Sequence, residues 1–89
     1  MAEYATLDVS ADFLESLIMQ GFSPNEQKRF ARALRLLDTN EQQPSLRVHR
    51  LQGKEAGIWS ASVSDELRIT FERLANGRKM LLRASRHYR

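Results

Sequence analysis

Two arginines and a histidine in the second half of the chain have side chains suited to phosphate chemistry. Arg68 and Arg83 fall in segments that alternate with a period of two, and continued alternation places His87 on the same face as both. Guanidinium groups stabilise the charge that develops on a phosphate under attack. An imidazole gives or takes a proton near neutral pH, and the Tyr88 hydroxyl adjoins it. The alternative is a solvated sheet face with scattered charges.

A second candidate group lies at the mouth of a polar loop. His49 and Arg50 precede the two-glycine stretch 52–57, which contains Lys54, and this loop could fold over the same face. The alternative for His49 is an ordinary surface position at a strand edge. We take the following basic residues as candidate phosphate contacts: Arg47, Arg50, Lys54 and Arg86. Trp59 could stack on a base, but its alternation with Ala61 and Val63 favours a core position.

The charge distribution favours a polyanionic partner for the second half of the chain. The 89 residues carry a formal net charge of +3. Residues 1–45 hold four Lys or Arg and seven Asp or Glu, a net charge of −3, whereas residues 46–89 hold ten and four, a net charge of +6. Arg outnumbers Lys eight to two in the basic half, and Arg is the better bidentate ligand for phosphate.

Several other chemistries lack the residues that they need. The chain has no cysteine, so thiolate zinc sites, disulfides and thiol nucleophiles are excluded. No His-x-x-x-His spacing supports zinc, no acidic cluster supports magnesium, and no glycine-rich phosphate loop is present. We therefore expect no cofactor and no metal. No apolar run approaches the length of a membrane span, and no signal peptide is evident, so we expect a cytoplasmic protein without membrane contact.

Signals in the first half of the chain predict a short strand and two helices. Residues 4–10 alternate loosely, and Ser10 then caps a helix whose predicted apolar face comprises Phe13, Leu14, Leu17 and Ile18. The second helix begins at Ser23, which is followed by Pro24 and by Glu26 at the capping-box position. Its apolar stripe ends before the polar segment 40–44.

After Pro44 the hydrophobic period changes from 3.6 to 2 and predicts four strands, at residues 46–51, 58–63, 67–71 and 79–84. Ala75-Asn76-Gly77 predicts a hairpin turn. The last strand is expected to turn Met80, Leu82 and Ala84 inward. The order β-α-α-β-β-β-β predicts an α+β fold in which both helices cover one face of a mainly antiparallel sheet. We expect a single domain over residues 1–89.

The basic half also resembles a known family. Leu46-x-x-His49-x-Leu51-x-Gly53 leads into Gly57-Ile58-Trp59-Ser60, then Leu67-Arg68-Ile69-Thr70-Phe71, and the chain ends Arg83-Ala84-Ser85-Arg86-His87-Tyr88-Arg89. This series resembles the RelE/ParE superfamily of toxins from bacterial toxin–antitoxin pairs, and its YoeB and YafQ types of mRNA interferase in particular. Those proteins share the predicted element order.

The resemblance implies a ribosome-dependent endoribonuclease that cuts mRNA without metal and thereby inhibits translation. The ribose 2′-OH attacks the adjacent phosphate and leaves a cyclic phosphate and a 5′-hydroxyl. Carried over to this sequence, Arg68 and Arg83 stabilise phosphate charge, His87 is the general acid, and Tyr88 orients or stacks on the substrate. His49 is the candidate general base. Ser45 stands near the position of the glutamate that serves as general base in the YoeB type. Lys54 is an alternative to a general base and would act electrostatically.

Two alternatives share the fold. One is a ParE-type poison of DNA gyrase, although the terminal His-Tyr pair favours the nuclease. The other is a non-catalytic module that binds RNA or protein. The family also implies an acidic, partly disordered antitoxin as partner, in a toxin–antitoxin hetero-oligomer, with the ribosome and mRNA as further partners. That antitoxin could cover the helix groove, a sheet edge or the basic face.

Overall fold

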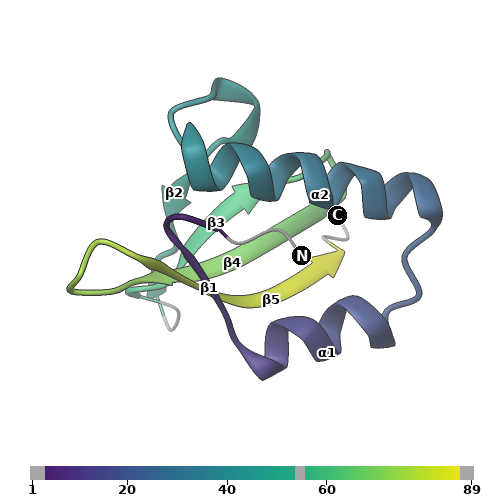
Figure 1. Cartoon of the computed structure of the whole chain (residues 1–89), viewed down its shortest axis with the longest axis horizontal. Coiled ribbons are helices and arrows are strands. Elements are labelled where there is room, and N and C mark those ends of the chain that lie inside the picture. The colour runs from purple at the N-terminus through teal and green to yellow at the C-terminus, as the bar shows by residue number, and fades with distance from the viewer. Residues whose placement is uncertain (1–3, 54–55, 87–89) are drawn as a thin grey trace.

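The computed structural model of the chain describes residues 4–53 and 56–86 and confirms the predicted α+β fold. The elements are β1 (Leu7–Val9), α1 (Ala11–Met19), α2 (Pro24–Thr39), the short 3-10 helix η1 (Pro44–Leu46), β2 (His49–Arg50), β3 (Trp59–Ser62), β4 (Leu67–Arg73) and β5 (Lys79–Arg86). The sheet order is β1-β5-β4-β3-β2 (Figure 1). Only the β1–β5 pairing is parallel among these strands.

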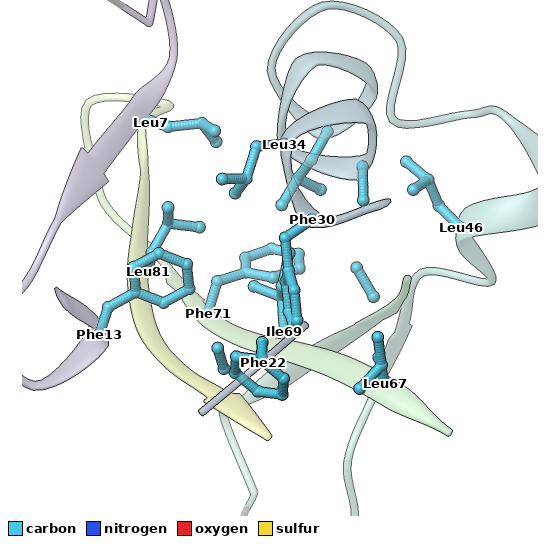
Figure 2. Packing of buried hydrophobic residues seen from close by; sticks show 14 residues of the cluster. Leu7, Phe13, Phe22, Phe30, Leu34, Leu46, Leu67, Ile69, Phe71 and Leu81 are labelled. Atoms are coloured by element: carbon cyan, nitrogen blue, oxygen red, sulfur yellow. The ribbon is translucent and has the colours of Figure 1, made fainter. Parts of the chain in front are cut away.

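One hydrophobic core joins both helices to the same face of the sheet. Phe13 from α1 and Phe30 from α2 belong to the same buried cluster as Ile69, Phe71 and Leu81 from β4 and β5 (Figure 2). The predicted alternation of β4 is therefore correct, with Ile69 and Phe71 inward and Arg68 half-exposed on the other side. No helix among the described residues is long and apolar enough to cross a bilayer.

Both predicted helix starts are confirmed. The Ser10 hydroxyl accepts a hydrogen bond from the backbone N–H of Phe13 at 3.0 Å. At α2, the Ser23 hydroxyl accepts from the Glu26 N–H at 3.2 Å, and the Glu26 carboxylate accepts from the Ser23 N–H at 2.9 Å. This reciprocal pair is a capping box, and it satisfies two N–H groups that the helix itself leaves without partners.

The predicted apolar face of α1 is only partly correct. Phe13 is buried, but Leu14 and Ile18 are 53% and 77% exposed. Leu17 packs against the core as predicted. The residues that meet the edge of β5 are polar, because β1 pairs with β5 only as far as Leu81 and leaves the rest of that strand edge open. The Ser16 hydroxyl accepts from the Ala84 N–H at 2.8 Å, and the Gln20 amide donates to the Ala84 carbonyl at 2.5 Å. Helix α1 thus completes the edge of β5 with side chains.

The predicted inward face of β5 is wrong at two positions. Thr70 pairs with Arg83, but the next residue, Phe71, pairs with Leu81, so Leu82 is an extra residue in the ladder. Such a bulge inverts the alternation on its N-terminal side. Leu81 is consequently the fully buried residue, and Met80 and Leu82 are half-exposed. Ala84 lies beyond the bulge and is buried as predicted.

The strand predicted at residues 46–51 is shorter and begins later. Residues 44–46 form η1, which buries Leu46, and Arg47 then adopts a left-handed conformation with φ of 46°. The turn formed by η1 and Arg47 delays the start of the strand, and His49 and Arg50 then pair with β3. The predicted hairpin at residues 75–77 is present between β4 and β5, with Gly77 at φ of 84°.

Candidate phosphate-binding face of the sheet

Strand register brings His49 and Arg83 into one row on the sheet face opposite the helices, here called the open face. His49 lies opposite Ser60, Ser60 opposite Thr70, and Thr70 opposite Arg83. Directly opposed residues of antiparallel strands point to the same side. With strands about 4.8 Å apart, the Cα atoms at the ends of this row are about 14 Å apart. Ser60 and Thr70 form the floor between the histidine and the arginine.

Arg68 belongs to the neighbouring row of the open face. It lies between Ser62 and Ser85, and its Nη1 donates to the Ser62 hydroxyl at 2.8 Å and to the Ser64 carbonyl at 3.2 Å. These bonds hold the guanidinium over β3. Arg83 is a diagonal neighbour across β4 and β5, at a typical Cα separation of about 7–8 Å. The structure therefore places both arginines on the open face, side by side.

Arg83 also lines a groove between β5 and α1 with a volume of about 370 Å³. Asp12, Glu15 and Met19 form the α1 side of this groove. The arginine itself is exposed, and no carboxylate lies within 4.0 Å of it among the residues that the structure describes. Its guanidinium is therefore accessible to an external anion.

The histidine at the other end of the row is hydrogen-bonded through one ring nitrogen to the backbone. Its Nδ1 lies 2.7 Å from the backbone carbonyl oxygen of Arg47. Because a carbonyl oxygen only accepts, Nδ1 must carry the proton in this bond, and the neutral ring then has Nε2 as an acceptor. His49 is exposed. In the neutral ring, Nε2 is then the nitrogen that can accept a proton.

The remaining predicted site residues lie elsewhere or outside the described residues. Arg50 pairs with Trp59 and therefore shares the other side of the sheet, at its exposed edge. Arg47 lines a hollow of about 340 Å³ that also contains Glu41, Trp59 and Arg73. Three predicted site residues lie outside the described ranges: Lys54, His87 and Tyr88.

Arg86 points toward the helices and not onto the open face. It pairs with the buried Leu67, and its two terminal nitrogens donate to the carboxylate of Glu26 at 2.5 and 2.8 Å. Its guanidinium also lies 5.0 Å from the ring centre of Phe22. The hydrogen bonds from Arg86, and then that from the Ser23 backbone, lower the pKa of Glu26 to about 2. Arg86 thus ties the end of β5 to the start of α2.

Trp59 packs against the core, as its alternation predicted, but its ring is not fully enclosed. It stacks with Phe71 at a centroid distance of 6.4 Å, and the Arg73 guanidinium lies 4.2 Å from the tryptophan ring centre. Glu41 accepts two hydrogen bonds from Arg73. The outer surface of Trp59 is therefore occupied by an internal cation.

Sequence reasoning missed the role of Ser60 as the link between His49 and Thr70. The alternation of Trp59 and Ala61 already placed Ser60 on the opposite side of β3, so the signal was present, but the register was needed to connect the row. Within residues 4–53 and 56–86, no three His, Cys, Asp or Glu side chains gather in a group that could hold a metal ion.

Comparison with known proteins identifies the fold. No protein-family model matches the sequence, and no curated protein matches it. A conserved hypothetical protein from Helicobacter pylori is 19% identical, with a TM-score of 0.70 over 92% of this chain and 93% of that one. The YoeB–YefM complex from Staphylococcus aureus matches with 18% identity and a TM-score of 0.69, over 98% and 100%. The Escherichia coli DinJ–YafQ toxin–antitoxin complex matches with 19% identity and a TM-score of 0.65, over 91% and 90%.

These similarities show that the chain has the fold of the YoeB, YafQ and RelE toxins, and they confirm at the level of fold the resemblance predicted from the sequence. The shared fold covers at least nine-tenths of each chain compared here. A fold supports many functions, so the activity has to be argued from the residues of the open face.

Proposed function

We propose that this chain is the toxin of a bacterial toxin–antitoxin pair and an endoribonuclease that cuts mRNA on the ribosome in the cytoplasm. The observation that carries the proposal is the row from His49 to Arg83, with Arg68 in the adjacent row. A base and two cations on one exposed sheet face suit a phosphodiester. The toxin fold supports the same reading.

The proposed reaction is an internal transfer at one phosphodiester of the RNA. Nε2 of His49 takes the proton of the 2′-OH as the 2′ oxygen bonds to phosphorus. The bond from phosphorus to the 5′ oxygen breaks, and that oxygen receives a proton from His87. The products are a 2′,3′-cyclic phosphate and a 5′-hydroxyl. Arg68 and Arg83 stabilise the additional negative charge on the phosphoryl oxygens, which is where positioned cations lower the barrier most.

The dimensions of the open face fit a single phosphodiester. The Cα atoms of His49 and Arg83 are about 14 Å apart, with Ser60 and Thr70 between them in the row. Ser60 is small and buried, so it does not project into the space between the side chains of His49 and Arg83. A phosphate group over Thr70 then has His49 and the Arg68 guanidinium on its β3 side and Arg83 on its β5 side. In this proposal Tyr88 orients the substrate, and Lys54 adds positive charge.

The proposal includes an acidic antitoxin as partner. Two of the similar structures are complexes of a toxin with an antitoxin. In this chain, residues 46–89 carry a net charge of +6, which suits an acidic segment that folds on binding. Such a partner neutralises the same cations that the substrate requires.

Inducible expression followed by mapping of mRNA ends tests the proposal. We expect growth arrest and new mRNA ends at translated positions for the wild type, and neither for His49→Gln or His87→Ala. Glu72→Gln, an exposed change on β4 outside the row, is the matched control and should behave as wild type. Trapped gyrase–DNA cleavage complexes without new mRNA ends would replace the nuclease by a gyrase poison. Growth arrest with neither would leave a binding module.

A further inference from the structure

Helix α2 carries a line of cations on the side that faces away from the sheet. Lys28, Arg32 and Arg35 are spaced by four and three residues, so they lie along one side of the helix over about 10 Å. Arg29 flanks this line, and all four side chains are exposed. We call these four residues the α2 stripe. Figure 1 shows α2 running along the outside of the molecule.

The cations of the α2 stripe form no ion pair with a carboxylate of the described residues. No carboxylate lies within 4.0 Å of any of the four cations in residues 4–53 and 56–86. Arg29 and Arg32 line a hollow that contains Asp65 at the β3–β4 turn, but neither forms an ion pair with it. The two acidic residues of α2 have other partners, since Glu26 binds Arg86 and Asp38 accepts hydrogen bonds from Thr6.

The α2 stripe differs in this respect from four basic residues of β4, β5 and the turn between them. Arg73, Arg78, Lys79 and Arg86 each form an ion pair with a carboxylate. In the stripe, by contrast, Lys28 and Arg32 are like charges at the i, i+4 spacing, which slightly destabilises a helix. The stripe therefore works against the stability of its own helix.

We propose that the α2 stripe is a second RNA-binding surface, separate from the open face, which takes the phosphate backbone of a single strand. A line of three cations over about 10 Å matches two or three consecutive phosphates, and phosphate contacts of this kind carry no sequence preference. The proposal does not depend on RNA cleavage.

Two other polyanions fit the stripe less well. An interfacial helix needs an apolar face to insert into lipid, but the apolar residues of α2 are already packed on the sheet, namely Phe30, Ala33, Leu34 and Leu37. An acidic peptide that folds on binding needs apolar anchors in addition to charge. The solvent-facing line of α2 offers none, since it consists of Lys28, Arg32 and Arg35. RNA needs only the cations.

The salt dependence of RNA binding tests the proposal. The probe is a fluorescent 2′-O-methyl RNA 20-mer, which lacks the attacking hydroxyl and therefore stays intact, and binding is followed by anisotropy across a salt series. The slope of log K against log salt concentration is negative, and each phosphate contact on a single strand adds about 0.7 to its magnitude. For Lys28→Gln/Arg32→Gln we expect weaker binding, a slope smaller in magnitude by about 1.4, and an unfolding temperature equal to or above that of the wild type.

A charge-matched control separates the stripe from net charge. Ala75→Glu/Asn76→Asp changes the net charge by the same two units at the exposed β4–β5 turn and should leave the slope unchanged. An equal slope change in both variants would overturn the proposal, as would an unchanged slope in the stripe variant. Binding to phosphatidylserine vesicles in preference to RNA, or equal competition by polyglutamate, would also overturn it. If the wild-type chain does not cleave RNA but the stripe variant still shows this slope difference, the proposed enzyme activity is contradicted and the second surface is not.

Discussion

Arg86 at the end of β5 and Glu26 in the first turn of α2 form a two-bond ion pair, with distances of 2.5 and 2.8 Å. The same Glu26 carboxylate accepts the Ser23 N–H in the capping box of α2. One carboxylate therefore joins the start of a helix to the last described residue of the sheet. The next residue in the sequence is His87.

This pair predicts a stability difference that depends on pH. The bond to Arg86, together with the Ser23 N–H, lowers the pKa of Glu26 from 4.5 to about 2. A carboxylate whose pKa is lowered in the folded state binds fewer protons there than in the unfolded state. Its contribution is therefore fully present above pH 4.5 and is lost as the pH falls toward 2. We expect Glu26→Gln to unfold at a lower temperature than wild type at pH 7, and the two to converge near pH 2.

The matched control for Glu26→Gln is Glu15→Gln, which makes the same change at an exposed carboxylate of α1 that forms no ion pair among the described residues. Thermal unfolding of all three proteins from pH 2 to pH 7 makes the comparison. If the difference in unfolding temperature between wild type and Glu26→Gln stays constant over this pH range, the ionised Glu26 carboxylate does not contribute to stability through its charge.

The buried serine of α1 predicts a second effect on stability. Ser16→Ala removes the acceptor of the Ala84 N–H. Leaving a buried donor without a partner costs about 1–3 kcal/mol. Leu14→Ala, on the exposed side of the same helix, should cost well under 1 kcal/mol, because this leucine buries little surface. Urea unfolding measures the free energy of unfolding of both variants. A larger loss of stability for Leu14→Ala than for Ser16→Ala would contradict the role of α1 as the polar cover of β5.

The open face predicts a separation of activity from stability. Arg83→Gln removes an exposed guanidinium that has no carboxylate partner among the described residues, so the unfolding temperature should change little. The rate of RNA cleavage should fall by about 100-fold or more, as is typical when one group that stabilises transition-state charge is removed. The measurement is a single-turnover cleavage rate on programmed ribosomes, beside an unfolding curve. A cleavage rate within threefold of wild type would remove Arg83 from the site.

Local sequence signals located most of the elements, but not the 3-10 helix η1 or all of the buried faces. The helix starts at Ser10 and Ser23 and the hairpin at Gly77 follow from residues close together in the chain, and each is present. The buried face of β5 was predicted from the strict alternation of side chains along a strand, and this alternation is interrupted at a bulge. Nothing in the residues around Leu82 marks it as the extra one, because the bulge depends on how β5 pairs with β4.

The same limit applies to α1 and to the candidate site. Ser16 and Gln20 face the sheet because β1 is too short to complete the edge of β5, a relation between segments more than 60 residues apart. Arg68 and Arg83 were placed correctly by alternation. That His49 shares a row with Arg83 follows from three successive strand registers, which hydrophobic patterning does not specify.

The most direct test of the account is the chemistry of the cut ends. The purified chain is incubated with ribosomes programmed with a defined mRNA, and the new ends are identified by mass spectrometry. We predict a 2′,3′-cyclic phosphate upstream and a 5′-hydroxyl downstream, and no product from His49→Gln or from mRNA with a single 2′-deoxy residue at the cut site. Ends that carry a 5′-phosphate, or cleavage of the 2′-deoxy substrate, would contradict attack by the 2′-OH at the open face.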